Sequence, residues 1–330
     1  MEQQEVKMWI IIGVLIGVAF GSVYILNNVL TDEEKPGSIT ITDDADRTVT
    51  LNSTAGRIVS LSPSNTEILF AIDAGDKVVG RDEYSDYPEE ALDIPTVGGF
   101  TTPNIEKILG LDPDVIIAAL LTQNAISSIE NQIPCLYFDP ESVNDVLSVI
   151  NRIGLVTGKE TEAQNLIDDM QSTVDDITSI TDDFTSAEKP SVFLEIFYEP
   201  YWTIGGSSHI NELISMTGGI NIFGDQDFSY STISEEVIIN SKPDIIVLYG
   251  EMGSYAVTID EVKNRDGWGD IPAVKNNQIY IIDGDLLNPC PRIVQGIEYL
   301  AYYFHPDLFP EPETMMGSAS ILTSISINSL

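Results

Sequence analysis

The sequence contains an internal repeat that narrows the folds open to it. Residues 104–118 read NIEKILGLDPDVIIA, and residues 234–248 read SEEVIINSKPDIIVL. In both segments a glutamate precedes a Pro-Asp pair by seven positions, and the matching residues lie 130 positions apart. Each copy predicts a short helix, a turn that ends at the proline, and a buried strand. Because continuous β-branched runs are typical of parallel strands covered on both faces, the repeat indicates a duplicated α/β unit.

The segment between the two copies predicts one long helix. Residues 160–184 (ETEAQNLIDDMQSTVDDITSITDDF) place apolar side chains at steps of three and four, which form one face of an amphipathic helix. At ~1.5 Å per residue this helix is roughly 37 Å long, enough to cross from one domain to another. Strand-like runs flank it at 57–62, 77–81, 134–139, 191–197 and 278–283. We therefore predict an α/β protein with two Rossmann-like lobes, mainly parallel sheets and one joining helix.

The N-terminal segment is predicted to lie outside this fold. Residues 8–31 carry no charge and include the run WIIIGVLIGVAFGSVYIL. About 20 apolar residues span a bilayer as a helix, so residues 1–30 are a retained transmembrane anchor or a secretory signal. No small-x-small cleavage site follows the run at a good position, and no cysteine follows it to carry a lipid, which favours the anchor. Lys7 before the run and the acid-rich TDEEK after it keep the N-terminus in the cytoplasm and the rest outside.

These features divide the chain into consecutive parts. The anchor is followed by a short polar linker, and a Ser/Thr-rich tail follows the last lobe. The expected parts are the linker 31–38, an N-terminal lobe 39–159, an interlobe helix 160–186, a C-terminal lobe 187–312 and the tail 313–330.

Charge and residue counts exclude several classes of function. Asp and Glu number 52 against 15 Lys and Arg, which gives a formal charge of -37 and argues against nucleic-acid binding, because phosphates are bound by basic patches. The two cysteines, Cys135 and Cys290, are too few for a disulfide scaffold or a thiolate cluster. The two histidines, His209 and His305, are too few for a three-histidine zinc site. We expect no resident metal.

Catalytic motifs are missing as well. The segment GLVTGKE at 154–160 lacks the spacing and the Ser/Thr of a phosphate-binding loop. No GxGxxG follows a strand, and no Ser or Cys lies in a nucleophile elbow. The chain is therefore predicted not to be an enzyme and to carry no cofactor. A membrane-anchored enzyme or sensor on the same scaffold remains the alternative class.

Five segments carry a resemblance to a known family. They are RIVSLSPSNTEILFAIDAGDKVVGRDEYSDYP (57–88), VGGFTTPNIEKILGLDPDVIIA (97–118), GGSSHINELISMTGGINIF (205–223), SEEVIINSKPDIIVL (234–248) and NPCPRI (288–293). Together they resemble the extracytoplasmic solute-binding proteins of ABC importers for cobalamin and ferric siderophores, over about residues 40–310. The resemblance implies two α/β lobes joined by one long helix, with the ligand held in the cleft between them. It also implies a monomer that works on the outer face of the cell membrane.

The resemblance implies a set of ligand-binding residues. Aromatic rings bury much apolar area with little loss of rotamer freedom, which suits a broad, partly flat corrinoid or iron chelate. The family's ligand-contacting positions correspond here to Tyr84, Phe100, Trp202, Tyr230 and Arg292. Each aromatic side chain could instead be part of the core, and Arg292 could instead form a stabilising ion pair. Where the cobalamin branch offers a further aromatic residue, this chain has Ala119 and Leu120, so a ferric siderophore or heme stays open beside a corrinoid.

Two glutamates of the repeat carry a separate prediction. In the family one glutamate of each lobe docks onto arginines of the permease dimer, and the matching residues here are Glu106 and Glu236. A symmetric permease dimer presents two equal sockets, which two pseudo-symmetric acids would fill. The alternative is that both are solvated acids favoured by the dipole of a helix N-terminus.

Overall fold

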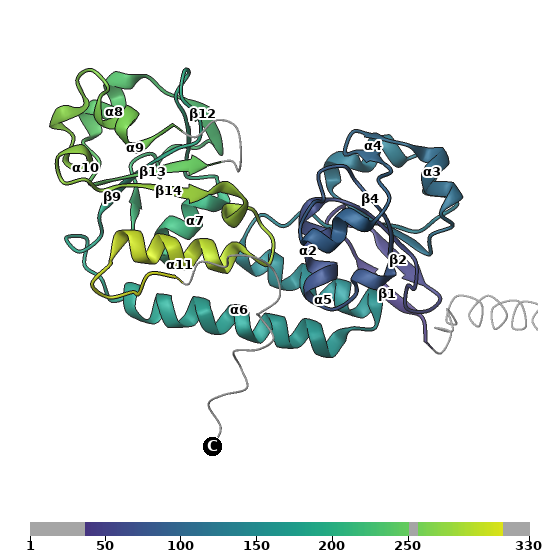
Figure 1. Ribbon diagram of the computed structural model, residues 1–330. Coiled ribbons are helices and arrows are strands. Elements are labelled where there is room, and N and C mark those ends of the chain that lie inside the picture. The colour runs from purple at the N-terminus through teal and green to yellow at the C-terminus, as the bar shows by residue number, and fades with distance from the viewer. Residues whose placement is uncertain (1–36, 251–256, 313–330) are drawn as a thin grey trace, which may run out of the picture.

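The protein is built of two lobes that lie side by side along one long helix. The computed structural model describes residues 37–250 and 257–312, and Figure 1 shows helix α6 (Glu160–Thr181) running along the same side of both lobes. The predicted anchor 1–30 and tail 313–330 lie outside the described residues. Among the helices of residues 37–250 and 257–312, none has the length and apolarity needed to cross a membrane. The chain divisions at residues 159 and 186 stay predictions.

Each lobe is organised around a four-stranded sheet in which every pairing is parallel. In the N-terminal lobe the strand order is β4-β3-β7-β8, formed by β3 (Ile58–Leu61), β4 (Val78–Arg81), β7 (Val115–Ala118) and β8 (Cys135–Tyr137). In the C-terminal lobe the order is β11-β9-β13-β14, formed by β9 (Ser191–Glu195), β11 (Ile220–Asn221), β13 (Ile245–Gly250) and β14 (Ile279–Asp283). In both sheets the first strand along the chain lies between the second and the third. The predicted fold class is confirmed.

Helices and small antiparallel ribbons complete the lobes. The main helices are α2 (Pro63–Ala71), α3 (Ile105–Gly110), α4 (Gln123–Ile126), α5 (Val143–Thr157), α7 (His209–Met216), α8 (Glu235–Ser241), α9 (Ile259–Lys263), α10 (Pro272–Lys275) and α11 (Ile293–Phe304). The antiparallel pairs are β1 (Ile39–Thr42) with β2 (Thr48–Leu51), β5 (Gly98–Gly99) with β6 (Thr102–Pro103), and β10 (Trp202–Ile204) with β12 (Tyr230–Thr232).

The Pro-Asp pair of the repeat has the same structural role in both lobes. In the N-terminal lobe, Asp114 Oδ2 accepts hydrogen bonds from the backbone N–H groups of Gly56 and Arg57, both at 2.8 Å, just before β3 begins. In the C-terminal lobe, Asp244 Oδ2 accepts from the backbone N–H of Ser191 at 3.0 Å and from its hydroxyl at 2.7 Å, where β9 begins. Each aspartate thus fastens the strand it precedes to the start of the neighbouring central strand, β3 or β9.

Helix α6 ends earlier than its hydrophobic pattern predicts. The expected helix runs to residue 184, whereas α6 ends at Thr181, whose hydroxyl donates a 2.7 Å hydrogen bond to the carbonyl of Met216. Ile180 continues the three-to-four spacing of the apolar residues, yet its side chain is exposed. The end of the helix is therefore set by a contact with the C-terminal lobe, which periodicity does not report.

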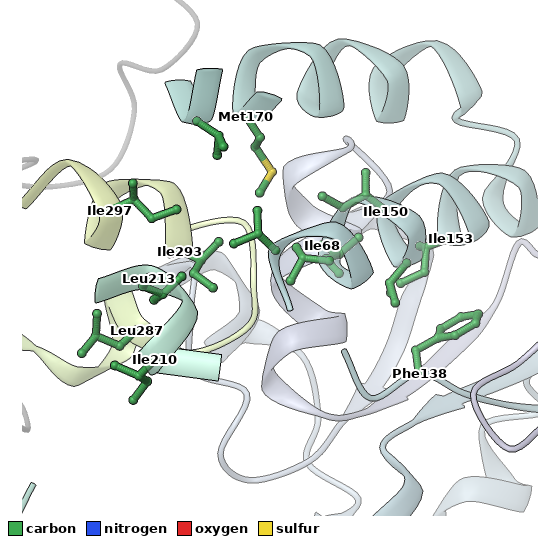
Figure 2. Close-up of a cluster of buried hydrophobic side chains, with 14 of the residues drawn as sticks. Ile68, Phe138, Ile150, Ile153, Met170, Ile210, Leu213, Leu287, Ile293 and Ile297 are labelled. Atoms are coloured by element: carbon green, nitrogen blue, oxygen red, sulfur yellow. The ribbon is translucent and has the colours of Figure 1, made fainter. Parts of the chain in front are cut away.

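One hydrophobic core continues through both lobes by way of α6. The buried face of α6 includes Ala163, Met170, Val174 and Ile177. The helix packs against α5 of the N-terminal lobe and against α7 and α11 of the C-terminal lobe. Figure 2 shows Met170 directed into this cluster, between Ile68 of α2 and Ile293 of α11. The other face of each sheet has a smaller core of its own, so each lobe has apolar packing on both sides of its sheet.

Candidate functional site

The carboxyl ends of the parallel strands are the place where an α/β lobe presents its functional loops. In the N-terminal lobe, β4 leads into the loop 82–88. In the C-terminal lobe, β9 leads into residues 196–201 and β14 leads into residues 284–292. Figure 1 shows β13 and β14 ending on the side that faces the other lobe. The loops that follow the strands therefore lie where the two lobes approach each other.

A contact between the lobes fixes this arrangement. The guanidinium of Arg292, just before α11, donates from Nε to Glu67 Oε2 at 2.9 Å and from Nη2 to Glu67 Oε1 at 2.6 Å. Glu67 belongs to α2 of the N-terminal lobe. The Arg292 Cζ atom also lies 3.9 Å from the ring centre of Tyr87, in the loop after β4. The segments that follow β3, β4 and β14 thus meet at these three side chains.

Exposed aromatic side chains lie on segments that follow strands of both sheets. Within the described residues, the large aromatic side chains that are exposed are Tyr84, Tyr87, Phe197, Tyr198, Trp202 and Tyr230. The first two lie in the loop after β4. The other four lie on the segment after β9 and on the ribbon β10–β12. A folded chain normally buries such side chains, so their concentration on these segments of both lobes points to a binding surface.

Two of the predicted aromatic residues lie against each other in the N-terminal lobe. Tyr84 is 55% exposed, and its ring stacks on that of Phe100 with centres 5.3 Å apart and planes 17° apart. Phe100 lies at the turn between β5 and β6. The backbone N–H of Glu83 donates to the carbonyl of Gly98 at 3.0 Å, which joins this turn to the loop 82–88.

Buried polar groups hold the loop that carries Tyr84. The Asp82 carboxylate accepts hydrogen bonds from the backbone N–H of Tyr84 at 2.8 Å and from the hydroxyl of Ser85. The Ser85 hydroxyl lies 2.9 Å from that of Thr66, which lies 2.8 Å from that of Ser60. Burial raises the pKa of Asp82, and the Ser85 and Tyr84 hydrogen bonds oppose that shift. The hydroxyl-rich SLSPSNT segment, residues 60–66, therefore holds the loop in place through these hydrogen bonds.

The other two predicted aromatic residues lie together in the C-terminal lobe. Trp202 is 41% exposed and Tyr230 is 45% exposed. In the β10–β12 ribbon Trp202 pairs with Thr232, and Ile204 pairs with Tyr230. Trp202 and Tyr230 are thus diagonal neighbours on one face of the ribbon, within reach of each other's rings.

Two features of the site were not predicted from the sequence. The first is the pair of Glu67 with Arg292. In the sequence, the one signal for it was an acidic residue in an otherwise apolar and hydroxyl-rich segment. Arg265 forms the second feature: its Nη1 and Nη2 donate to the Glu195 carboxylate at 2.6 and 2.7 Å. Its guanidinium lies over the rings of Tyr198 at 4.3 Å and Trp268 at 4.6 Å. Both arginines next to the exposed aromatic residues are thus already paired with carboxylates.

The two predicted docking glutamates occupy equivalent positions, apart from the aromatic residues. Glu106 lies in the first turn of α3, and Glu236 lies in the first turn of α8; both side chains are exposed. Hydrogen bonds from its own backbone N–H and from the Ser234 hydroxyl lower the pKa of Glu236. Figure 1 shows α3 and α8 on the side of the two lobes that is opposite to α6. The two acids therefore lie on one side of the molecule, one on each lobe.

The side chains that hold a metal ion in proteins are typically clustered His, Cys, Asp or Glu. In residues 37–250 and 257–312, no group of three or more His, Cys, Asp or Glu side chains is arranged to hold a metal ion. Cys135 and Cys290 are both buried and free. Burial raises the pKa of Cys135 to about 12, so its thiol is protonated at neutral pH.

Comparisons with known proteins agree with this architecture. A model of the periplasmic binding protein family matches residues 58–286, which include strands of both sheets. The uncharacterized ABC transporter substrate-binding lipoprotein YvrC of Bacillus subtilis is 33% identical over 281 residues, covering 83% of this chain and 87% of that protein.

Similar solved structures are solute-binding proteins as well. A possible iron-binding, periplasmic solute-binding protein from Staphylococcus epidermidis is 29% identical, with a TM-score of 0.66 over 77% of this chain and 100% of that one. The periplasmic vitamin B12 binding protein of Vibrio cholerae is 27% identical, with a TM-score of 0.64 over 76% of this chain and 97% of that one.

Proposed function

We propose a function from one premise: this chain belongs to the periplasmic binding protein family, and it is a solute-binding protein of ABC importers. On that basis we propose that it captures a corrinoid between its two lobes and delivers it to the permease of an ABC importer. In this proposal the protein works on the outer face of the cell membrane, and residues 8–30 hold it there as an anchor.

The observation that carries the proposal is the set of exposed aromatic side chains. They lie on the segment that follows β4 in the N-terminal lobe, and on the segment that follows β9 and the ribbon β10–β12 in the C-terminal lobe. A corrinoid is broad, partly flat and partly apolar, and its rim carries amide groups. Aromatic rings above and below such a ligand bury its apolar faces, while tyrosine hydroxyls and the indole N–H can bond the amides.

A second ligand class is supported by a different observation. The strand β7 is followed by Ala119 and Leu120, where no aromatic side chain is available. One of the similar solved structures is described as a possible iron-binding protein. A ferric siderophore or heme bound at the same place is therefore the alternative.

Ligand titration tests the proposal. We expect cobalamin or cobinamide to bind the purified domain, and we expect Trp202→Ala and Tyr84→Ala each to weaken binding by ~5- to 150-fold, the equivalent of 1–3 kcal/mol. Tyr302→Ala, which removes a ring near the end of α11 away from the loops, is the matched control and should change affinity little. Tight binding of a ferric siderophore or hemin instead would favour the second ligand class. If Trp202→Ala and Tyr84→Ala both leave the affinity for the bound ligand unchanged, these positions are not in the site.

We further propose that Glu106 and Glu236 dock the loaded protein onto two basic sockets of the permease. An exposed ion pair contributes only ~0–1 kcal/mol, whereas a pair desolvated at an interface costs ~2–5 kcal/mol when one partner is removed. Transport by the reconstituted importer at raised salt, which screens the general attraction of the -37 charge, should fall with Glu106→Ala or Glu236→Ala and fall further in the double variant. Ligand affinity should stay the same. Full transport by the double variant would show that both residues are only solvated acids.

A further inference from the structure

The Glu67–Arg292 pair is a closed, mostly buried contact between the lobes. Both nitrogens of the guanidinium that face Glu67 donate to it, and each carboxylate oxygen accepts one bond. The side chains are only 7% and 15% exposed. The Tyr87 ring covers the guanidinium at 3.9 Å, and an oxygen of Asp285 lies 3.9 Å from Nη2. Two directions from which a ligand could approach Arg292 are thus occupied by an aromatic ring and a second acid.

The pair has the geometry of a guanidinium–carboxylate contact, with one bond to each carboxylate oxygen. Burial disfavours the charged guanidinium, but the hydrogen bonds and the charge of Glu67 outweigh it and raise the pKa of Arg292 above its usual value. Burial also raises the pKa of Glu67, and the bonds from Arg292 oppose that shift. Two parallel N–H···O bonds between a guanidinium and a carboxylate are among the strongest in proteins. Arg292 therefore has little remaining capacity to attract a second anion.

Two other arginines near the loops are also engaged, one by a carboxylate and one by backbone carbonyls. Arg265 is paired through both terminal nitrogens with Glu195, the last residue of β9, and the two side chains are 5% and 2% exposed. Arg81, the last residue of β4, donates to the backbone carbonyls of Ala91 and Asp82. The carboxylate of Glu83 lies beside Gly99, next to the turn that carries Phe100, and adds negative charge to this surface. The arginines at the carboxyl ends of the described strands thus leave no cation open to a ligand.

We infer that Glu67 sets the charge selectivity of the site. By holding Arg292 in a closed pair, it makes Arg292 a strut between the lobes instead of an anchor for anions. The site then accepts a broad ligand of zero or positive charge and rejects one that brings several carboxylates, because those carboxylates would lose water without gaining a cation. This inference rests on the proposed function, and it assigns Glu67 the role of a specificity-determining residue.

Two flat metal macrocycles of different rim charge test the inference. Dicyanocobinamide carries amides at its rim, and hemin carries two ionised propionates. We expect the wild-type domain to bind dicyanocobinamide at least about 100-fold more tightly than hemin. In Glu67→Gln, which keeps the shape of the side chain and frees the charge of Arg292, the ratio of hemin affinity to dicyanocobinamide affinity should rise at least about 10-fold. The double variant Glu67→Gln, Arg292→Met should lose the gain for hemin.

A second measurement needs no variant, and it decides the matter if Glu67→Gln does not fold. The diamide of hemin has the same ring without the carboxylates, so the wild type should bind it at least about 10-fold more tightly than hemin. Equal binding of hemin and its diamide, or a hemin gain that survives the loss of Arg292, would overturn the inference and leave the solute-binding function standing. Preference of the wild type for hemin over dicyanocobinamide would overturn it as well. If no macrocycle binds the wild type or any variant, the proposed function fails, and the inference fails with it.

Discussion

Shortening Met170 tests whether the two lobes share one core. Met170 is 2% exposed on α6, and its side chain lies in a cluster with residues of both lobes (Figure 2). Met170→Ala removes three heavy atoms beyond Cβ, and at about 0.8 kcal/mol for each buried methylene-sized group the lost transfer free energy is about 2 kcal/mol. The cavity that remains adds about 1–2 kcal/mol, so the free energy of unfolding should fall by about 3–4 kcal/mol.

Calorimetric or circular-dichroism melting measures this loss. At about 2–4 °C per kcal/mol, the scale of domains of 150–250 residues, Tm should fall by about 6–16 °C. Because Met170 contacts both lobes through the same cluster, we expect one transition that moves as a whole. The matched control is Ile180→Ala, which shortens an apolar side chain of the same helix that is 39% exposed and should cost less than about 1 kcal/mol.

Two results would refute this reasoning. A fall in Tm no larger than that of Ile180→Ala would mean that the neighbouring side chains fill the space left by Met170 and that the shared core is not weakened. Two separate transitions, of which only one moves, would mean that α6 belongs to one lobe and that the shared core does not couple them.

Three further predictions follow from buried groups. Gly154→Ala should destabilise the protein by about 1–3 kcal/mol, because a Cβ there would lie 2.6 Å from the Cβ of Ala163, where α5 crosses α6; urea unfolding measures it, and a change below about 0.5 kcal/mol would contradict it. Cys135, with its pKa of about 12, should resist iodoacetamide at pH 8 in the native protein and react after unfolding, as peptide mass spectrometry can show. Burial lowers the pKa of His209, whose Nε2–H donates to the carbonyl of Leu287 at 2.8 Å; the unfolded state therefore binds a proton first, and stability should fall as pH decreases below about 6.5. Melting in high salt, which screens the acidic surface, should show a weaker dependence on pH in His209→Gln, and an unchanged dependence would exclude His209 as the cause.

The sequence predicted the architecture because its signals are local and repeated. The Pro-Asp pairs, the aliphatic runs and the three-to-four spacing of residues 160–184 each report on neighbouring residues, and both sheets and α6 lie where these patterns indicate. The end of α6 was predicted three residues too late, because a hydrogen bond from the Thr181 hydroxyl to the carbonyl of Met216, at the end of α7, decides it. Such a contact between distant residues does not appear in the hydrophobic periodicity of the sequence.

The site was predictable only in part, for a related reason. Aromatic residues in Ser-, Pro- and Gly-rich segments indicate exposed loops, and Tyr84, Trp202 and Tyr230 are indeed exposed. Glu67 and Arg292 are separated by 225 positions, and nothing in one sequence joins two charged residues at that distance. The structure contains the ion pair at Arg292 that the sequence left as an alternative. Its partner, Glu67, could be identified only from the three-dimensional structure.

The two aspartates of the repeat also bear on how the chain folds. Asp114 closes a loop of 57 residues onto Arg57, and Asp244 closes one of 53 residues onto Ser191. The entropic cost of closing these loops differs by less than about 0.1 kcal/mol. Each contact fixes the register of a central parallel strand pair, with Ile58 opposite Val115 and Ile245 opposite Val192. Loop closure therefore costs the two lobes nearly the same entropy, and this term alone favours neither lobe as the first to form.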